Sequence, residues 1–144
     1  MSRAFVHEPW VFRGEPFEEV PEGIENFVYL LTDIVTGKRY IGKKSFVSVS
    51  KVPQANGRNK HVRKESDWRK YYSSNLDIQQ LVKGGNGRRF HREILWLCPN
   101  KGSASYLEAK EIFTRGCLEQ PDKWYNYYCE IQINGGHLKL EGVK

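Results

Sequence analysis

Two short apolar runs around a polar turn stand out in the pattern of hydrophobic and polar positions. The runs cover residues 27–32 and 39–43, and an Asp/Thr/Gly segment joins them. Segments rich in β-branched and aromatic residues on either side of such a turn predict a β-hairpin. Pairing that is symmetric about Ile34 and Val35 places Tyr29 opposite Tyr40, so the two phenols are expected on one face of a sheet.

The same face is predicted to carry other groups beside the two phenols. Gly42 follows where a side chain would otherwise crowd the face, and Lys43 and Lys44 come next. The hairpin could therefore present two phenols, a bare backbone patch and two ammonium groups together. Aromatic residues also favour strands that are simply packed in a core, so the pattern leaves both interpretations open.

The remaining pattern predicts an α+β fold, with a small central antiparallel sheet flanked by helices. Helices are expected over 76–83, capped by Ser74, and from Ser103 or Ser105 to about residue 116. A third strand is expected over 88–97, and strands over 127–133 and 137–140 complete a C-terminal hairpin. The expected organisation is an acidic arm (1–25), a core (26–126) and this hairpin (127–144).

Composition limits the class of protein. The 144 residues contain no apolar run long enough to span a membrane, and the first residues lack a signal-peptide core. Three cysteines without CxxC spacing are typical of reduced thiols in an intracellular protein. Residues 1–25 hold two basic and six acidic residues, a net charge of −4, whereas the other 119 hold 21 basic and 11 acidic, a net charge of +10. A basic body with 13% aromatic residues suits a nucleic acid partner.

The polar segment 45–64 concentrates this basic charge. We expect a mobile loop that contacts DNA phosphates, although a plain surface insertion has the same composition. After it, Trp68, Tyr71 and Tyr72 fall at helical spacing behind a cap at Ser66 or Asp67, which is more typical of core packing than of chemistry. The basic side chains of the loop are Lys51, Arg58, Lys60, His61, Arg63 and Lys64.

Glu108 lies at the edge of the apolar side of the last predicted helix, one turn before Ile112. A carboxylate there is either solvated or placed to bind a hard cation through oxygen. Glu111 is the alternative ligand, but Arg115 follows it one turn later.

The paired segments Phe27-Val28-Tyr29 and Tyr40-Ile41-Gly42 resemble the signature of the GIY-YIG nuclease family. The second half matches in full, and in the first half Phe and Val replace Gly and Ile. Residues 68–73 (Trp-Arg-Lys-Tyr-Tyr-Ser) resemble the phage-type branch related to free-standing homing endonucleases, and Trp124-Tyr125-Asn126 resembles the closing Tyr-Asn motif.

The resemblance implies an endonuclease that depends on Mg²⁺ or Mn²⁺ and hydrolyses double-stranded DNA. Ala104, Glu108 and Ile112 fit the family pattern around the metal-binding Glu. Tyr40 or Tyr29 would serve as general base or position the water, and as a base it would need its pKa lowered by Lys43 or Lys44.

Other residues are candidates for binding the phosphate, supporting the site or contacting DNA. Arg69 or Arg63 would stabilise the phosphate, and Asn126 would support the site. Tyr72 could stand where other branches have His. His91 is a candidate general base or DNA contact, although a His beside Arg residues is more often an ordinary surface group. Lys44 is a further candidate DNA contact.

Two other classes stay open: a DNA-binding protein that kept the fold without catalysis, and an interaction module whose tyrosines are core. Homodimerisation is one way in which target recognition could be supplied.

Overall fold

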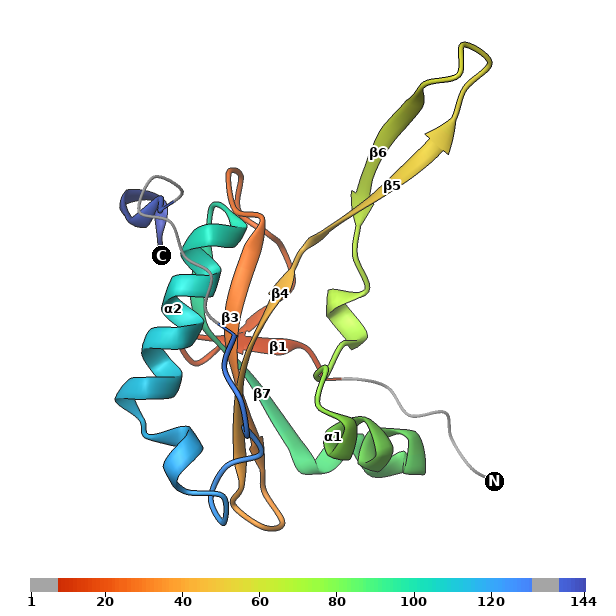
Figure 1. Ribbon diagram of the computed structural model, residues 1–144. Coiled ribbons are helices and arrows are strands. Elements are labelled where there is room, and N and C mark those ends of the chain that lie inside the picture. Colours follow the sequence, from red (N-terminus) through yellow and green to blue (C-terminus); the bar gives the residue numbers. More distant parts are fainter. Residues whose placement is uncertain (1–7, 131–137) are drawn as a thin grey trace.

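The computed structural model describes residues 8–130 and 138–144 (Figure 1). Its centre is a five-stranded sheet in the order β2-β1-β7-β3-β4. The α+β prediction is confirmed, but the sheet is mixed, because β1 runs parallel to β7 while the other pairs are antiparallel. The strands are β1 (Trp10–Phe12), β2 (Glu15–Phe17), β3 (Asn26–Asp33), β4 (Arg39–Ser45) and β7 (Phe90–Cys98).

The acidic arm enters the sheet because it carries a core residue. Trp10, in β1, has no solvent exposure, and its indole N–H donates to the carbonyl of Trp68 at 2.7 Å. Burial of one tryptophan side chain is a large hydrophobic contribution. The arm therefore packs on the body of the protein and adds β1 and β2 to the sheet.

Strand β3 is buried on both faces, and its alternate residues belong to two cores. Phe27 and Tyr29 join an aromatic cluster with Trp68, whereas Val28 and Leu30 pack against residues of helix α2. Helix α2 (Lys101–Thr114) covers one face of the sheet, while α1 (Leu76–Leu81) lies on the other side (Figure 1). The sheet is the middle layer, and the period of two along β3 assigns each side chain to one layer.

Both helices begin at asparagine rather than at the predicted serines. Asn75 Oδ1 accepts a hydrogen bond from the Ile78 N–H at 3.1 Å, and Asn100 Oδ1 accepts from the Ser103 N–H at 2.9 Å. Asn and Ser are equally good caps, so composition alone did not decide between neighbours. Helix α1 continues into a π-helical turn, Val82–Asn86, and short 3-10 turns cover Trp68–Lys70, Gly87–Arg89, Cys117–Glu119 and Leu140–Gly142.

The basic segment predicted as a mobile loop is a two-stranded sheet. Strand β5 (Val47–Pro53) pairs with β6 (Asn59–Glu65), and the turn between them contains Gly57 at φ +78°. The alternating Val-Ser-Val-Ser sequence favours a strand, and its polar residues hid that signal. We call this sheet the β5–β6 ribbon.

The chain after α2 differs from the predicted C-terminal hairpin. Residues 127–130 and 138–139 form no strand, and the intervening part of that prediction lies outside the described residues. Lys144 exchanges two backbone hydrogen bonds with Leu97 in β7. None of the helices built by the described residues is both long and apolar enough for a membrane span.

Candidate functional site

The β3–β4 hairpin places Tyr29 and Tyr40 on one face, although not in the predicted register. Tyr29 lies opposite Gly42, and Tyr40 lies opposite Leu31. The two rings are diagonal neighbours with centroids 6.2 Å apart. The register differs from the prediction by two residues, because the pairing is centred between Val35 and Thr36 and not between Ile34 and Val35. An even shift returns every side chain to its original face, so the shared face is confirmed.

Asp33 closes that loop and is completely buried. Its carboxylate accepts hydrogen bonds from the backbone of Val35 and Thr36, from the Tyr125 hydroxyl at 2.7 Å and from Arg89 at 2.7 and 2.9 Å. Burial by itself raises the pKa of Asp33, but the bonds from Arg89 and Tyr125 outweigh it and hold the pKa well below its ordinary value. Asp33 thereby ties the hairpin to β7 and to the segment after α2.

Gly42 lets the two phenols lie against the backbone. A Cβ atom added to Gly42 would lie 2.9 Å from Tyr40 Cε1 and closer still to Tyr29 Oη and Cζ. Real Cβ atoms essentially never come within 3.0 Å of a heavy atom outside their own residue and its chain neighbours. A side chain at Gly42 would crowd this face, as predicted. However, Gly42 is itself buried and both tyrosine rings cover its backbone, so the expected bare patch is not presented.

Tyr29 is part of the core. Only 1% of it is exposed, and its ring packs edge-on against Trp10 and Tyr71, with centroids 5.2 and 6.1 Å away. Burial first, and then the neighbouring phenols Tyr71 and Tyr40, raise the pKa of Tyr29 well above its ordinary value. Tyr29 is thus a neutral, buried phenol beneath Tyr40.

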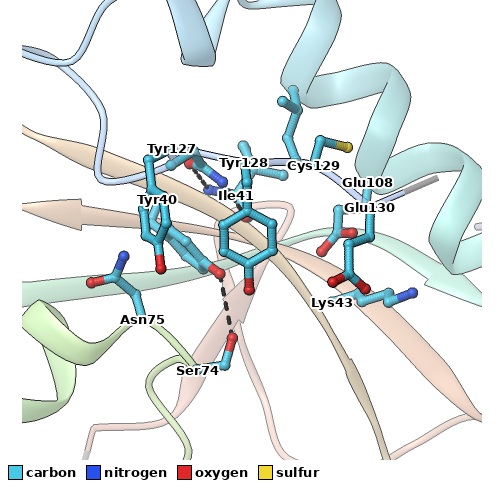
Figure 2. A pocket seen from close by; sticks show the side chains of 12 residues that line it. Tyr40, Ile41, Lys43, Ser74, Asn75, Glu108, Tyr127, Tyr128, Cys129 and Glu130 are labelled. Atoms are coloured by element: carbon cyan, nitrogen blue, oxygen red, sulfur yellow. Dashed lines mark hydrogen bonds between the residues drawn. The ribbon is translucent and has the colours of Figure 1, made fainter.

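Beside Tyr40 the surface opens into a cavity of about 200 Å³ (Figure 2). Four parts of the chain line it: β4, the residues before α1, helix α2, and the segment 126–130. It therefore collects four of the predicted site residues from distant parts of the sequence, which are Tyr40, Lys43, Glu108 and Asn126.

Helix α2 delivers Glu108 to this cavity. Ala104 and Ile112, one turn before and after it, are 0% and 3% exposed, so the helix packs its flanking turns and leaves the carboxylate at the rim. Burial raises the pKa of Glu108, and the charge of Lys43 acts in the opposite direction. Glu111 is occupied elsewhere, since it accepts hydrogen bonds from the Trp96 indole N–H and from Arg115.

Lys43 and Lys44 do not activate the tyrosines as predicted. Lys43 donates to the Ser105 hydroxyl, and Lys44 pairs with Asp67 at 2.7 Å. Burial raises the pKa of Tyr40, whose hydroxyl lies 3.4 Å from that of Ser74. The predicted lowering of the phenol pKa by lysine is therefore wrong for the protein as described, because burial dominates.

Asn126 is buried, and its side-chain amide hydrogen-bonds to the backbone of β4. Its Nδ2 donates to the Ile41 carbonyl and its Oδ1 accepts from the Ile41 N–H, both at 2.9 Å. Backbone bonds from Arg39 to Lys123 and Tyr125 continue the same seam. Asn126 thus holds one wall of the cavity against the strand that carries Tyr40.

Four other predicted residues are not lining this cavity. Arg69 and Arg63 are exposed and pair with Glu65 and Glu25. Tyr72 and His91 line a different, smaller hollow together with Arg92. Buried Arg92 donates to the carbonyls of Arg69 and Tyr71, each at 2.9 Å, and its guanidinium lies over the Tyr72 ring.

The sequence reasoning missed several residues of the cavity. Ser74 was assigned to a helix cap and Tyr127 and Tyr128 to a strand, yet both phenols line the cavity and are 73% and 57% exposed. Glu130 brings a second carboxylate, and in Figure 2 Glu108 and Glu130 both point into the cavity on the side of Lys43. Two adjacent tyrosines directly after Asn126 were the sequence feature that could have indicated this wall of the cavity.

The donors in the cavity suit a hard divalent cation. No hydrogen bond or ion pair within residues 8–130 and 138–144 occupies the Glu108 carboxylate, and nearby oxygen atoms come from Glu130 and from phenols. Mg²⁺ is commonly bound through one or two carboxylates, with water and substrate phosphate completing its shell. Glu108 is the residue best placed to hold it.

Comparison with known proteins gave one match. The model of a family described as "Putative endonuclease segE, GIY-YIG domain" matches residues 10–129. No curated protein and no solved structure matches the chain.

Proposed function

Because the chain belongs to the GIY-YIG endonuclease domain family, we propose that it is a Mg²⁺- or Mn²⁺-dependent endonuclease that hydrolyses phosphodiester bonds in double-stranded DNA. The observation that carries this proposal is one cavity lined by Tyr40, Lys43 and Glu108. A carboxylate can bind a cation, a phenol can hydrogen-bond to water or phosphate, and an ammonium group can stabilise phosphate charge, so together they can support phosphodiester hydrolysis.

Glu108 would hold the cation, with Glu130 near enough in the same cavity to assist. When bound, the cation would supply positive charge at the scissile phosphate and a more acidic water molecule. The raised pKa of Glu108, caused by burial, marks a carboxylate whose charge is incompletely compensated in the free protein. A cation at this position would provide that compensation.

Tyr40 would contact the attacking water or the phosphate. Because burial raises its pKa, its phenol is protonated at neutral pH and donates a hydrogen bond unless a bound ligand changes that balance. Ser74, 3.4 Å away, would fix the orientation of this hydroxyl. Tyr29 would act as a positioning residue, since it lies under Tyr40 and Gly42 and not in the cavity.

Lys43 replaces the predicted arginines as the cation beside the phosphate. It is the single Lys or Arg side chain among the described residues that line the cavity. A phosphoryl group gains negative charge on its oxygens during attack, and a nearby ammonium group stabilises that charge. Asn126 would keep the wall formed by 126–130 closed against β4.

Cleavage of supercoiled plasmid in Mg²⁺ tests the proposal. We expect Glu108→Ala to lose cutting, because the cation loses its main ligand, and to keep or improve DNA binding, because a negative charge is removed. EDTA should stop cutting by the unaltered chain. Gel mobility distinguishes nicked from linear product, and analytical ultracentrifugation with DNA tests whether the chain forms a homodimer.

Glu111→Ala is the matched control. It removes a carboxylate from the same helix, but from a side chain that binds Trp96 and Arg115 away from the cavity. Cutting should persist in this variant after correction for any loss of folded protein. Plasmid that is retained but never cut in Mg²⁺ or Mn²⁺ would favour the non-catalytic DNA-binding alternative.

A further inference from the structure

The β5–β6 ribbon stands apart from the core. It forms its own two-stranded sheet, projects from the end of β4 (Figure 1), and residues 49–61 are exposed throughout. Two-stranded sheets without a third strand or a hydrophobic face are marginal in water. A projecting ribbon of this kind has surface on both faces for a partner.

The base of the ribbon is fixed to the core. Phe46, between β4 and β5, is 2% exposed and stacks on Phe27 with centroids 4.5 Å apart. The Ser66 N–H donates to the Phe46 carbonyl at 2.9 Å, and the Ser66 hydroxyl donates to the Ser45 carbonyl at 2.6 Å. The ribbon is therefore held in one direction relative to the cavity.

The charge of the ribbon has one sign. Residues 47–64 include five Lys or Arg residues and no Asp or Glu. Glu65, at the end of β6, is already bonded to Arg69 and to the Trp68 indole N–H. This distribution complements a polyanion.

The two faces of the ribbon differ in chemistry. Register pairs Ser48 with Lys64 and Val52 with Lys60, and Ser50 lies between them on the same face. We call this the serine–lysine face. The opposite face carries Lys51, His61 and Arg63, and there Arg63 is already paired with Glu25. The serine–lysine face alone combines hydroxyl groups with ammonium groups and has no acidic neighbour among its paired positions.

We propose that the β5–β6 ribbon enters the major groove of DNA with its serine–lysine face against the base edges. A major groove about 12 Å wide admits a two-stranded ribbon, and Lys and Ser side chains hydrogen-bond to base edges there. Arg58 at the tip and Lys51 on the other face contact phosphates, which fix the register of the ribbon on the duplex.

The length of the ribbon sets how many base pairs it can contact. Each strand has seven residues, which at about 3.3 Å per residue extend roughly 23 Å. That length corresponds to about 6 or 7 base pairs at roughly 3.4 Å per pair. The location of the cut relative to these base pairs rests on the proposed function, whereas groove binding itself does not.

Binding to modified duplexes tests the proposal. The Glu108→Ala protein is used to enrich duplexes from a random-sequence pool, and affinity for an enriched duplex is measured by fluorescence anisotropy. Replacing guanine by 7-deazaguanine removes the N7 acceptor from the major groove, whereas replacing guanine by inosine removes the amino group from the minor groove. We expect a loss of about tenfold with 7-deazaguanine and no loss with inosine.

Two double variants distinguish contacts to base edges from general electrostatic attraction to the phosphates. In the Glu108→Ala protein, Lys60→Ala with Lys64→Ala should weaken binding about tenfold or more and abolish the effect of 7-deazaguanine. Lys51→Ala with Arg58→Ala removes the same charge. It should lower affinity and the salt dependence while the effect of 7-deazaguanine remains.

Three results would overturn the proposal: no enriched sequence, a loss with inosine instead of 7-deazaguanine, or identical behaviour of the two double variants. Because the assay measures binding alone, a chain that binds through the groove and never cuts would support the ribbon and refute the nuclease. A chain that cuts plasmid with no effect of 7-deazaguanine would do the reverse.

Discussion

Replacing Gly42 by alanine is the sharpest test of how the two phenols are arranged. The new Cβ would lie 2.9 Å from Tyr40 Cε1 and even closer to Tyr29 Oη and Cζ. The Tyr29 ring cannot withdraw easily, because it is 1% exposed and packs edge-on against Trp10. Overpacking in a filled core costs about 1–3 kcal/mol, and we expect the upper half of that range because both rings must move.

Thermal unfolding and plasmid cleavage measure the two consequences. At roughly 3 °C per kcal/mol for a chain of this size, Gly42→Ala should lower Tm by several degrees. Cleavage measured well below Tm should fall as well, because Tyr40 lines the cavity and must shift. Gly84→Ala is the matched control. Its Cβ would meet nothing nearer than Asn86 Nδ2 at 3.5 Å, so stability should stay unchanged or rise by up to about 1 kcal/mol.

A Gly42→Ala protein with the Tm and cleavage rate of the unaltered chain would refute this reasoning. It would mean that the phenols do not lie over the backbone of Gly42. If Tm falls but each folded molecule still cleaves at the rate of the unaltered chain, only the inference that Gly42 sets the position of Tyr40 in the cavity would be refuted.

Three further predictions concern the hairpin and its supports. Tyr40→Phe should slow cleavage by about 10² or more, because a hydroxyl in the cavity is lost. Tyr29→Phe should slow it far less, and equal effects in kinetic assays would contradict the assigned positions. Asn126→Ala leaves the backbone groups of Ile41 without partners and should cost about 1–3 kcal/mol in urea unfolding; an unchanged midpoint would exclude that seam. Asp33→Asn should lower Tm by several degrees at neutral pH. Since the folded-state pKa of Asp33 lies below the unfolded value near ~3.9, the difference from the unaltered chain should persist above that pH and shrink as pH falls further. A gap that widens in acid would contradict the lowered pKa.

The sequence predicted the parts of the fold that depend on local pattern. The two runs rich in β-branched and aromatic residues around an Asp/Thr/Gly segment predicted the hairpin, and the apolar spacing around Ile112 predicted helix α2. The β5–β6 ribbon was missed, because its alternating Val-Ser-Val-Ser stretch is short and lies in a segment rich in polar and basic residues. The parallel pairing of β1 with β7 was missed, because the burial of Trp10 depends on contacts with residues distant in sequence, such as Trp68.

The candidate site divides in the same way. Residues chosen from short motifs, Tyr40, Glu108 and Asn126, meet at one cavity. The arginines did not, because Arg63 lies on the projecting ribbon and Arg69 is drawn to Glu65. Lys43, which the sequence had placed beside the two tyrosines, is the basic side chain that lines the cavity among the described residues.

The sequence by itself determined which residues alternate, which begin a helix and which can carry charge, since those properties act over a few neighbouring positions. The tertiary structure alone decided that Tyr29 is sealed in the core while Tyr40 faces a cavity. Both are tyrosines of one hairpin face, but burial raises a pKa and removes access only when distant residues such as Trp10 and Tyr71 pack around the ring. Exposure and proximity are properties of the packed chain, and they separate a phenol sealed in the core from one that lines a cavity.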